Sequence, residues 1–120
     1  MKLNPDNVRN LLLHLEENLD FDKAIHLQTG DTDPDTLYTA TKLIEAGYLK
    51  GSVSHFIGGG CLIIIQSITW DGHQFLDNIR PKTSWEKTKS LSKQIGGASL
   101  DILSKIAVKV TTDLINGQLE

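Results

Sequence analysis

A run of isoleucines directly behind three glycines constrains the fold of this chain more than any other feature. Residues 62–65 are apolar at every position, and the β-branched side chains of the three isoleucines at 63–65 favour an extended backbone. The glycines at 58–60 supply the positive φ that a tight turn needs. A second strand-like run, 52–57, precedes them, so we expect a β-hairpin with strands at 52–57 and 62–68. Because the second strand is so apolar, it should be covered on both faces.

Helix signals lie on both sides of this hairpin. Asp33 and Pro34 suit the cap and the first position of a helix that ends at Gly47. After the hairpin, Thr69 is the expected cap of a helix that Pro81 stops. The hairpin is therefore predicted to lie between two helices.

A further helix and a short strand are expected before this unit. Asn4 is a good cap, and apolar residues at three- and four-residue steps continue that helix to about Leu19. Residues 24–27 are interpreted as one strand that pairs with the hairpin. This order predicts the α+β class, with a winged-helix-like domain over residues 1–81. The second helix of such a domain is either absent or compressed into residues 28–33.

Residues 82–120 are predicted to form a C-terminal helical extension. One helix should run from Trp85 to Ile95 with Ser84 as its cap, and another from Ala98 or Ser99 to Ile115. The apolar stripe of the last helix comprises Leu100, Leu103, Ile106, Ala107, Val110 and Leu114. A large aliphatic side chain is worth roughly 1.5–3 kcal/mol when it is buried, so this stripe must be covered. Three coverings are open: the chain's own core, a second copy in a homodimer, or another protein.

The charges of the chain are distributed unevenly. The net charge of −3 argues against a general affinity for nucleic acid. Residues 1–80 hold six Lys and Arg against eleven Asp and Glu, a balance of −5, whereas residues 81–120 hold six against four, a balance of +2. The residues predicted to contact DNA or a protein partner, with the tryptophan as a stacking ring, are Lys42, Lys82, Trp85, Lys87, Lys89 and Lys93.

The sequence offers no pattern typical of catalysis or cofactor binding. The four histidines and Cys61 are scattered singly, without the spacing of a metal site. A phosphate loop needs a helix directly after its glycines, but a strand is expected after residues 58–60. We therefore expect no enzyme activity, no metal, no cofactor and no small-molecule substrate.

The same features indicate a cellular compartment. A single cysteine excludes an internal disulfide and fits a reducing cytoplasm. The first residues are too polar for a signal peptide, and no apolar run is long enough to span a membrane. We therefore expect a protein in the cytoplasm of a host cell.

Several motifs together resemble a known family. They are Met1–Asp6 with Arg9, Glu16–Asn18, Glu45–Tyr48, Gly58–Cys61, the pattern Thr69-x-x-Gly72-His73-x-Phe75-Leu76-x-x-Ile79-Arg80, Trp85–Lys89 and the helix 100–115. Over nearly all of its length the chain resembles the domain-of-unknown-function family 2513, small uncharacterised proteins common in phages and prophages of Gram-positive bacteria. The resemblance implies a mobile-element origin, a winged-helix-like fold and no established activity.

These features together lead to a functional hypothesis. We expect a non-catalytic regulatory or accessory binding protein that contacts DNA or a protein partner, with a homodimer formed through the last helix. The alternative is a module that binds only protein, such as a modulator of a host defence or replication protein.

Overall fold

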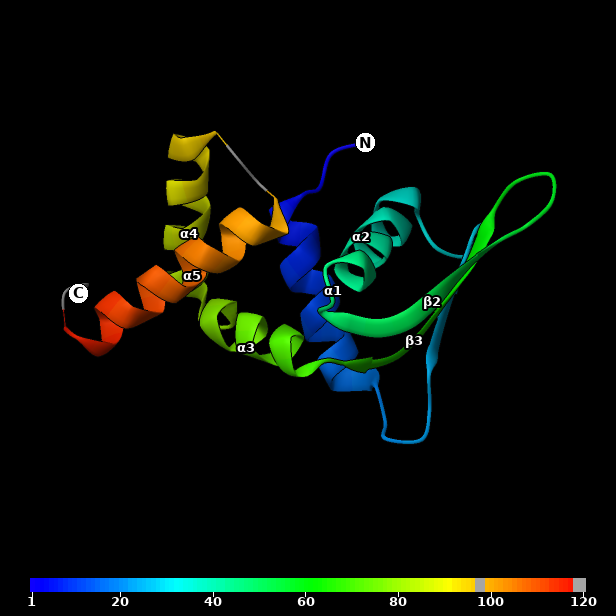
Figure 1. Cartoon of the computed structure of the whole chain (residues 1–120), viewed down its shortest axis with the longest axis horizontal. Coiled ribbons are helices and arrows are strands. Elements are labelled where there is room, and N and C mark those ends of the chain that lie inside the picture. The colour runs from blue at the N-terminus through cyan, green and yellow to red at the C-terminus, as the bar shows by residue number, and fades with distance from the viewer. Residues whose placement is uncertain (97–98, 118–120) are drawn as a thin grey trace.

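The computed structural model describes residues 1–96 and 99–117, which form an α+β fold of five helices and one three-stranded antiparallel sheet (Figure 1). In chain order the elements are α1 Pro5–Asn18, β1 Ile25–Gln28, α2 Pro34–Glu45, β2 Leu49–His55, β3 Cys61–Ile68, α3 Trp70–Ile79, α4 Lys82–Ile95 and α5 Leu100–Ile115. The molecule is elongated, 52 × 33 × 19 Å, and the hairpin of β2 and β3 projects from one end while α4 and α5 lie at the other.

The sheet has the order β1-β3-β2, so the isoleucine-rich strand is central. Ile25 of β1 lies opposite Ile65, and Leu49 of β2 lies opposite Ile68. The predicted pairing of the short first strand with the hairpin is therefore confirmed. A β-bulge between Lys50 and Gly51 interrupts the second pairing.

The hairpin turn is longer than the sequence predicts. The Phe56 N–H donates to the Gly60 carbonyl at 2.9 Å, and Gly58, Gly59 and Gly60 all have positive φ. Because the turn includes Phe56 and Ile57, β2 ends at His55, and it begins at Leu49. The predicted bounds of 52–57 are therefore wrong at both ends, although the predicted turn at the glycines is present.

The connection between β1 and α2 contains no helix among its described residues. It consists of turns and an isolated bridge between Thr29 and Thr32. One helix of the usual winged-helix order is thus missing here, as the sequence indicated. The α+β class is established, while assignment to the winged-helix class stays a prediction.

The expected caps are found at four helices but not at the fifth. The side chains of Asn4, Asp33, Thr69 and Ser99 each accept a hydrogen bond from a backbone N–H of the helix that follows. Ala98, the other start considered for the last helix, lies outside the described residues. Ser84 was predicted to cap a helix beginning at Trp85, but α4 begins at Lys82 and Ser84 is buried inside it. Pro81 suits this earlier start, since proline lacks the N–H that a helix interior requires.

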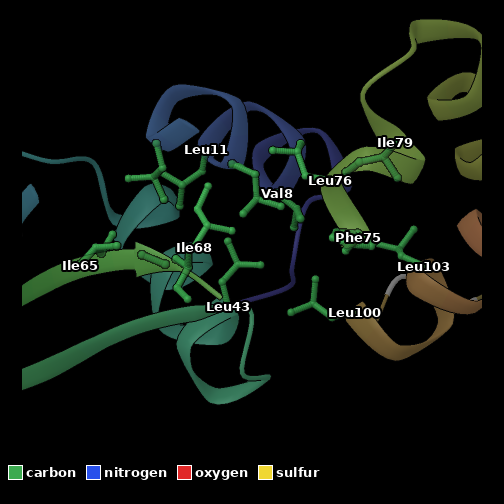
Figure 2. Packing of buried hydrophobic residues seen from close by; sticks show 14 of the residues in the cluster. Val8, Leu11, Leu43, Ile65, Ile68, Phe75, Leu76, Ile79, Leu100 and Leu103 are labelled. Carbon is green, nitrogen blue, oxygen red and sulfur yellow. The ribbon is translucent and has the colours of Figure 1, made fainter. Parts of the chain in front are cut away.

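One hydrophobic cluster joins the helices to the sheet (Figure 2). Val8, Leu43, Ile65, Leu76 and Leu103 are completely buried in it. The cluster therefore continues from the N-terminal 81 residues into the C-terminal helices. The boundary predicted between residues 81 and 82 stays a prediction.

The central strand is completely covered on one face only. Ile63 and Ile65 are fully buried, whereas Leu62 and Ile64 are half-buried. Successive side chains of a strand point to opposite faces, which explains the alternation. The prediction that this strand is covered on both faces is therefore confirmed for one face and wrong for the other.

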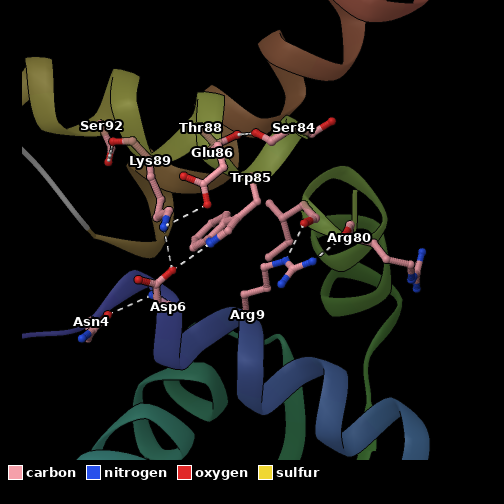
Figure 3. A network of polar contacts seen from close by, with 11 residues as sticks. Asn4, Asp6, Arg9, Arg80, Ser84, Trp85, Glu86, Thr88, Lys89 and Ser92 are labelled. Carbon is pink, nitrogen blue, oxygen red and sulfur yellow. Dashed lines mark hydrogen bonds and ion pairs between the residues drawn. The ribbon is translucent and has the colours of Figure 1, made fainter. Parts of the chain in front are cut away.

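Arg9 fastens α1 to the end of α3 (Figure 3). Its Nε donates to the Ile79 carbonyl at 3.0 Å and its Nη2 donates to the Arg80 carbonyl at 2.6 Å. These carbonyls belong to the last turn of a helix, where they lack partners within the helix and carry the negative end of its dipole. A half-buried guanidinium thus satisfies a helix end that lies about seventy residues away in sequence.

Candidate interaction surface

The six residues predicted to contact DNA or a partner do not form one surface. Lys82, Lys87 and Lys93 are exposed on α4 and make no ion pair with a described residue. Lys42 is on α2, where its Nζ lies 3.3 Å from the Glu45 carboxylate and 5.4 Å from the centre of the Tyr38 ring. Its charge is thus partly matched within its own helix.

Trp85 requires the clearest correction. Its exposed fraction is 3 %, and its Nε1 donates to Asp6 Oδ1 at 2.9 Å (Figure 3). The Lys89 Nζ lies 2.9 Å from the same Asp6 oxygen and 5.7 Å from the centre of the Trp85 ring. Trp85 is therefore part of the core and cannot serve as a stacking ring, and Lys89 holds α4 against the start of α1.

These contacts change the titration of both charged partners. The hydrogen bond from Lys89, followed by that from Trp85, lowers the pKa of Asp6 below its ordinary value of 3.8. The hydrogen bond to Asp6 raises the pKa of Lys89 above its ordinary value. Each group favours the charged form of the other, as expected for an ion pair.

The stripe predicted for a dimer interface is covered by the chain itself. Leu100, Leu103, Ile106, Ala107 and Val110 are buried, with α5 packed against α3 and α4. Leu114, near the end of α5, is 38 % exposed. Of the three coverings left open, back-folding on the chain's own helices therefore accounts for the stripe. The five buried side chains are not free to form a dimer interface.

Three aromatic side chains that the sequence did not single out are exposed, Phe56 by 49 % and two others by more. Phe21, in the loop between α1 and β1, is 99 % exposed, and Trp70, the first residue of α3, is 77 % exposed. Each has an aspartate beside it in sequence, and neither continues an apolar stripe. That local pattern does not identify them by itself, because Trp85, which precedes Glu86, shares it and is buried.

A hollow of about 620 Å³ has Phe21 on its wall. Leu15 and Ile68 lie beneath it, and both are already buried by the chain itself, with exposed fractions of 0 % and 8 %. Trp70 comes one helical turn before His73, on the solvent side of α3. We call this feature the aromatic hollow; its lining residues are Leu15, Glu16, Leu19, Asp20, Phe21, Asp22, Lys23, Ala24, Lys50, Gln66, Ser67, Ile68 and His73.

Residues 1–96 and 99–117 contain neither a metal-binding cluster nor a helix that could span a membrane. Within these ranges no three His, Cys, Asp or Glu side chains gather closely enough to hold a metal ion. No helix in the same ranges combines the length and apolar character needed to cross a bilayer.

Comparison with known proteins places the chain in a family. The sequence model of the family described as "Hypothetical protein (DUF2513)" matches residues 2–99. An uncharacterized protein of Haemophilus influenzae is 29% identical over 118 residues, which cover 96% of this chain and 99% of that protein. Its source lies outside the Gram-positive bacteria that the resemblance named. No solved structure is similar enough to count as a match. The chain belongs to domain-of-unknown-function family 2513, as its motifs indicated.

Proposed function

We propose that this protein is a non-catalytic binding module that docks on another protein through the aromatic hollow. The observation that carries the proposal is the exposed ring of Phe21 on the wall of the hollow, together with Trp70, which is exposed on the same helix as the wall residue His73. In the cell such a module would act as a regulatory or accessory protein of a mobile element.

The energetics of aromatic side chains support this choice. A large aromatic left in water forgoes a stabilisation comparable with that of a buried core residue. Tryptophan is strongly enriched among the few residues that dominate binding at protein interfaces, above all where it is desolvated at the centre of the patch. Phe21 and Trp70 therefore gain more from a partner than from their present positions.

The polar groups of the hollow support binding rather than reaction. Ser67 and His73 are both on its wall, but no hydrogen bond links them, and none joins the His73 ring to a carboxylate among the described residues. A nucleophile is activated by a base within hydrogen-bond reach, and that base is normally oriented by a third group. The hollow offers no such chain of contacts.

The test is affinity capture from a lysate of the cells that carry the gene, read by quantitative mass spectrometry. The variant Phe21→Ser/Trp70→Ser removes both aromatics without touching the core. The control, Ile57→Ser/Val108→Ser, removes two other exposed apolar side chains, one from the hairpin turn and one from α5. We expect the wild type and the control to enrich the same proteins and the aromatic variant to lose them. Equal enrichment by all three proteins, or none by any, would contradict the proposal.

A second candidate function, DNA binding, rests on the unpaired lysines of α4. Lys82, Lys87 and Lys93 are exposed and free to meet phosphate. Binding of this kind weakens steeply with salt, because each neutralised phosphate releases counterions. Gel-shift titrations of the wild type and of Lys87→Glu/Lys93→Glu test it: salt-sensitive binding that the variant loses would favour DNA, and no binding at low salt would exclude it.

A further inference from the structure

The two edges of the sheet differ in how much of their backbone is already hydrogen-bonded. β1 and β2 are both edge strands, because β3 lies between them. At the β1 edge, the Gln28 carbonyl accepts hydrogen bonds from the N–H groups of Asp31 and Thr32, so the turn after the strand closes this edge. β2 instead follows the hairpin outward, past the end of α2 (Figure 1).

The hydrogen bonds of β3 determine which backbone groups of β2 point outward. The Cys61 carbonyl accepts from the Thr29 N–H at 3.1 Å, and the Cys61 N–H donates to Thr29 Oγ1 at 2.9 Å. Both backbone groups of Cys61 thus face away from His55, which lies opposite it on β2. Hydrogen-bonded and non-hydrogen-bonded pairs alternate along an antiparallel ladder. The N–H and C=O groups of His55, Val53 and Gly51 therefore point to the outer edge.

These outward groups are left over by the fold of a single copy. Among the described residues, no turn, loop or cap hydrogen bond involves the backbone of Gly51, Val53 or His55. Gly51 and Val53 are half-buried and His55 is exposed. A row of unpaired N–H and C=O groups along a strand is a template for pairing with a further strand.

The sequence of β2 lacks the features that usually prevent such pairing. Natural proteins protect an edge strand with charged side chains, proline, bulges or a covering element. Residues 51–70 contain no Asp, Glu, Lys, Arg or Pro. The bulge at Lys50 and Gly51 lies at the start of the strand, and the pairing from Gly51 to His55 is regular. No charge on this stretch therefore repels an approaching strand.

We infer that β2 pairs antiparallel with β2 of a second copy, about a two-fold axis at Val53, and joins the two sheets into one. In this register Gly51 lies opposite His55 of the second copy, and Val53 lies opposite its own counterpart. Each outward N–H then meets an outward C=O, so one strand satisfies the whole edge of the other. The contact uses the same patch on both subunits and the β1 edge is closed, so assembly stops at a dimer.

The side chains of this register are compatible with close pairing. Ser52 lies opposite Ser54 of the second copy, and both are small and exposed. At each end Lys50 lies opposite Phe56, whose ring is 49 % exposed in a single copy. The lysine stem can cover this ring while the ammonium group lies near its face. Because Lys50 is the only charged residue of the strand, no like charges oppose each other.

Sedimentation velocity on the full chain tests the inference. Protein concentrations from about 5 to about 500 µM cover the weak affinities expected of a small interface. We expect the wild type to show a reversible equilibrium between monomer and dimer. Ser52→Lys/Ser54→Lys places lysine opposite lysine at two positions and should raise the Kd of the dimer at least about tenfold.

A second variant makes the test specific for the register. Ser52→Glu/Ser54→Lys places glutamate opposite lysine at the same two positions, and should keep the Kd within about threefold of the wild type. The matched control is His26→Lys/Gln28→Lys. These residues lie opposite Ile64 and Leu62 on β3, as Ser52 and Ser54 do, but on the β1 side. The control should leave the Kd unchanged.

Disulfide trapping gives a second measurement without a change of charge. In the background Cys61→Ser, the variants Ser52→Cys and Ser54→Cys are treated with oxidised glutathione, separately and mixed. In the inferred register the two cysteines face each other in a non-hydrogen-bonded pair, with Cα atoms about 4.5 Å apart, within the range of a disulfide. We expect a covalent dimer from the mixture and little from either variant alone.

Several results would overturn the inference. A wild type that stays monomeric over the whole range of concentrations does so, and so does growth beyond a dimer. A dimer that withstands the lysine pair, is not restored by the glutamate–lysine pair, or dissociates in the β1 control also contradicts it, as does equal trapping with and without mixing. The inference does not depend on the proposed function, which the capture experiment tests separately through Phe21 and Trp70.

Discussion

Replacing Asp6 by alanine and by asparagine separates two roles of one carboxylate. Asp6 accepts the hydrogen bond of the Trp85 indole at 2.9 Å and pairs with Lys89 at the same distance. In Asp6→Ala the indole N–H stays buried, because Trp85 is 3 % exposed, but it has no acceptor. In Asp6→Asn the amide oxygen can still accept from the indole, and only the charge is lost.

The structure sets the size of each effect. A buried donor left without a partner costs about 1–3 kcal/mol. The ion pair is worth less: the Asp6 side chain is 54% exposed, and exposed pairs contribute about 0–1 kcal/mol. We therefore expect the free energy of unfolding to fall by about 2 kcal/mol more in Asp6→Ala than in Asp6→Asn.

Urea denaturation at neutral pH, followed by far-ultraviolet circular dichroism, measures both values. Tryptophan fluorescence gives a second probe of the same transition, measured in the background Trp70→Phe so that it reports on Trp85 alone. Equal losses in the two variants, or a larger loss in Asp6→Asn, would refute the assignment of the stability to the indole hydrogen bond.

The charge of Asp6 also predicts how the stability of the fold depends on pH. The pKa of Asp6 is lower in the folded protein than its ordinary value of 3.8. The charge therefore stabilises the fold above that ordinary value, and the contribution is lost as the pH falls through the lowered pKa. The difference in stability between the wild type and Asp6→Asn should thus be constant near neutral pH and close in acid. A difference that persists in acid would contradict this account.

Three further changes test the packing. Arg9→Met leaves the last carbonyls of α3 without their donor, so the free energy of unfolding measured with urea should fall by about 2 kcal/mol. Arg80→Met breaks only partly exposed ion pairs, so it should lower the free energy of unfolding by about 1 kcal/mol or less. Equal losses in the two variants would contradict the capping role of Arg9. Gly72→Ala should destabilise the fold by about 1–3 kcal/mol although alanine favours helices, because its Cβ would overlap the Tyr48 carbonyl; a raised melting temperature would contradict this. Leu103→Ala should lower the free energy of unfolding by about 2–5 kcal/mol without changing the molar mass measured by light scattering. A change from dimer to monomer in this variant would instead support the predicted dimer interface.

Local signals in the sequence were sufficient to predict most elements of the fold. Caps such as Asn4, Asp33 and Thr69 satisfy N–H groups within three residues of themselves, so their effect does not depend on distant parts of the chain. The hairpin turn is likewise local, because only glycine readily adopts the positive φ found at residues 58–60. Where a local signal misled, as at Ser84, a neighbouring proline provided an equally good start.

The site was much less predictable, because burial is decided between segments that are far apart. Trp85 and Phe21 are both aromatic residues beside charged ones, and nothing in their neighbourhoods separates them. Trp85 is buried because Asp6, 79 residues away, accepts its N–H; Phe21 finds no such partner and stays in water.

For this protein, then, the sequence by itself determined the type and order of the helices, strands and turns, since those preferences act over a few residues. Only the tertiary structure decided which apolar side chains were left for a partner. That outcome depends on which of many surfaces pack together. In this protein the apolar stripe of α5 packs against α3 and α4 and is therefore not left for a partner.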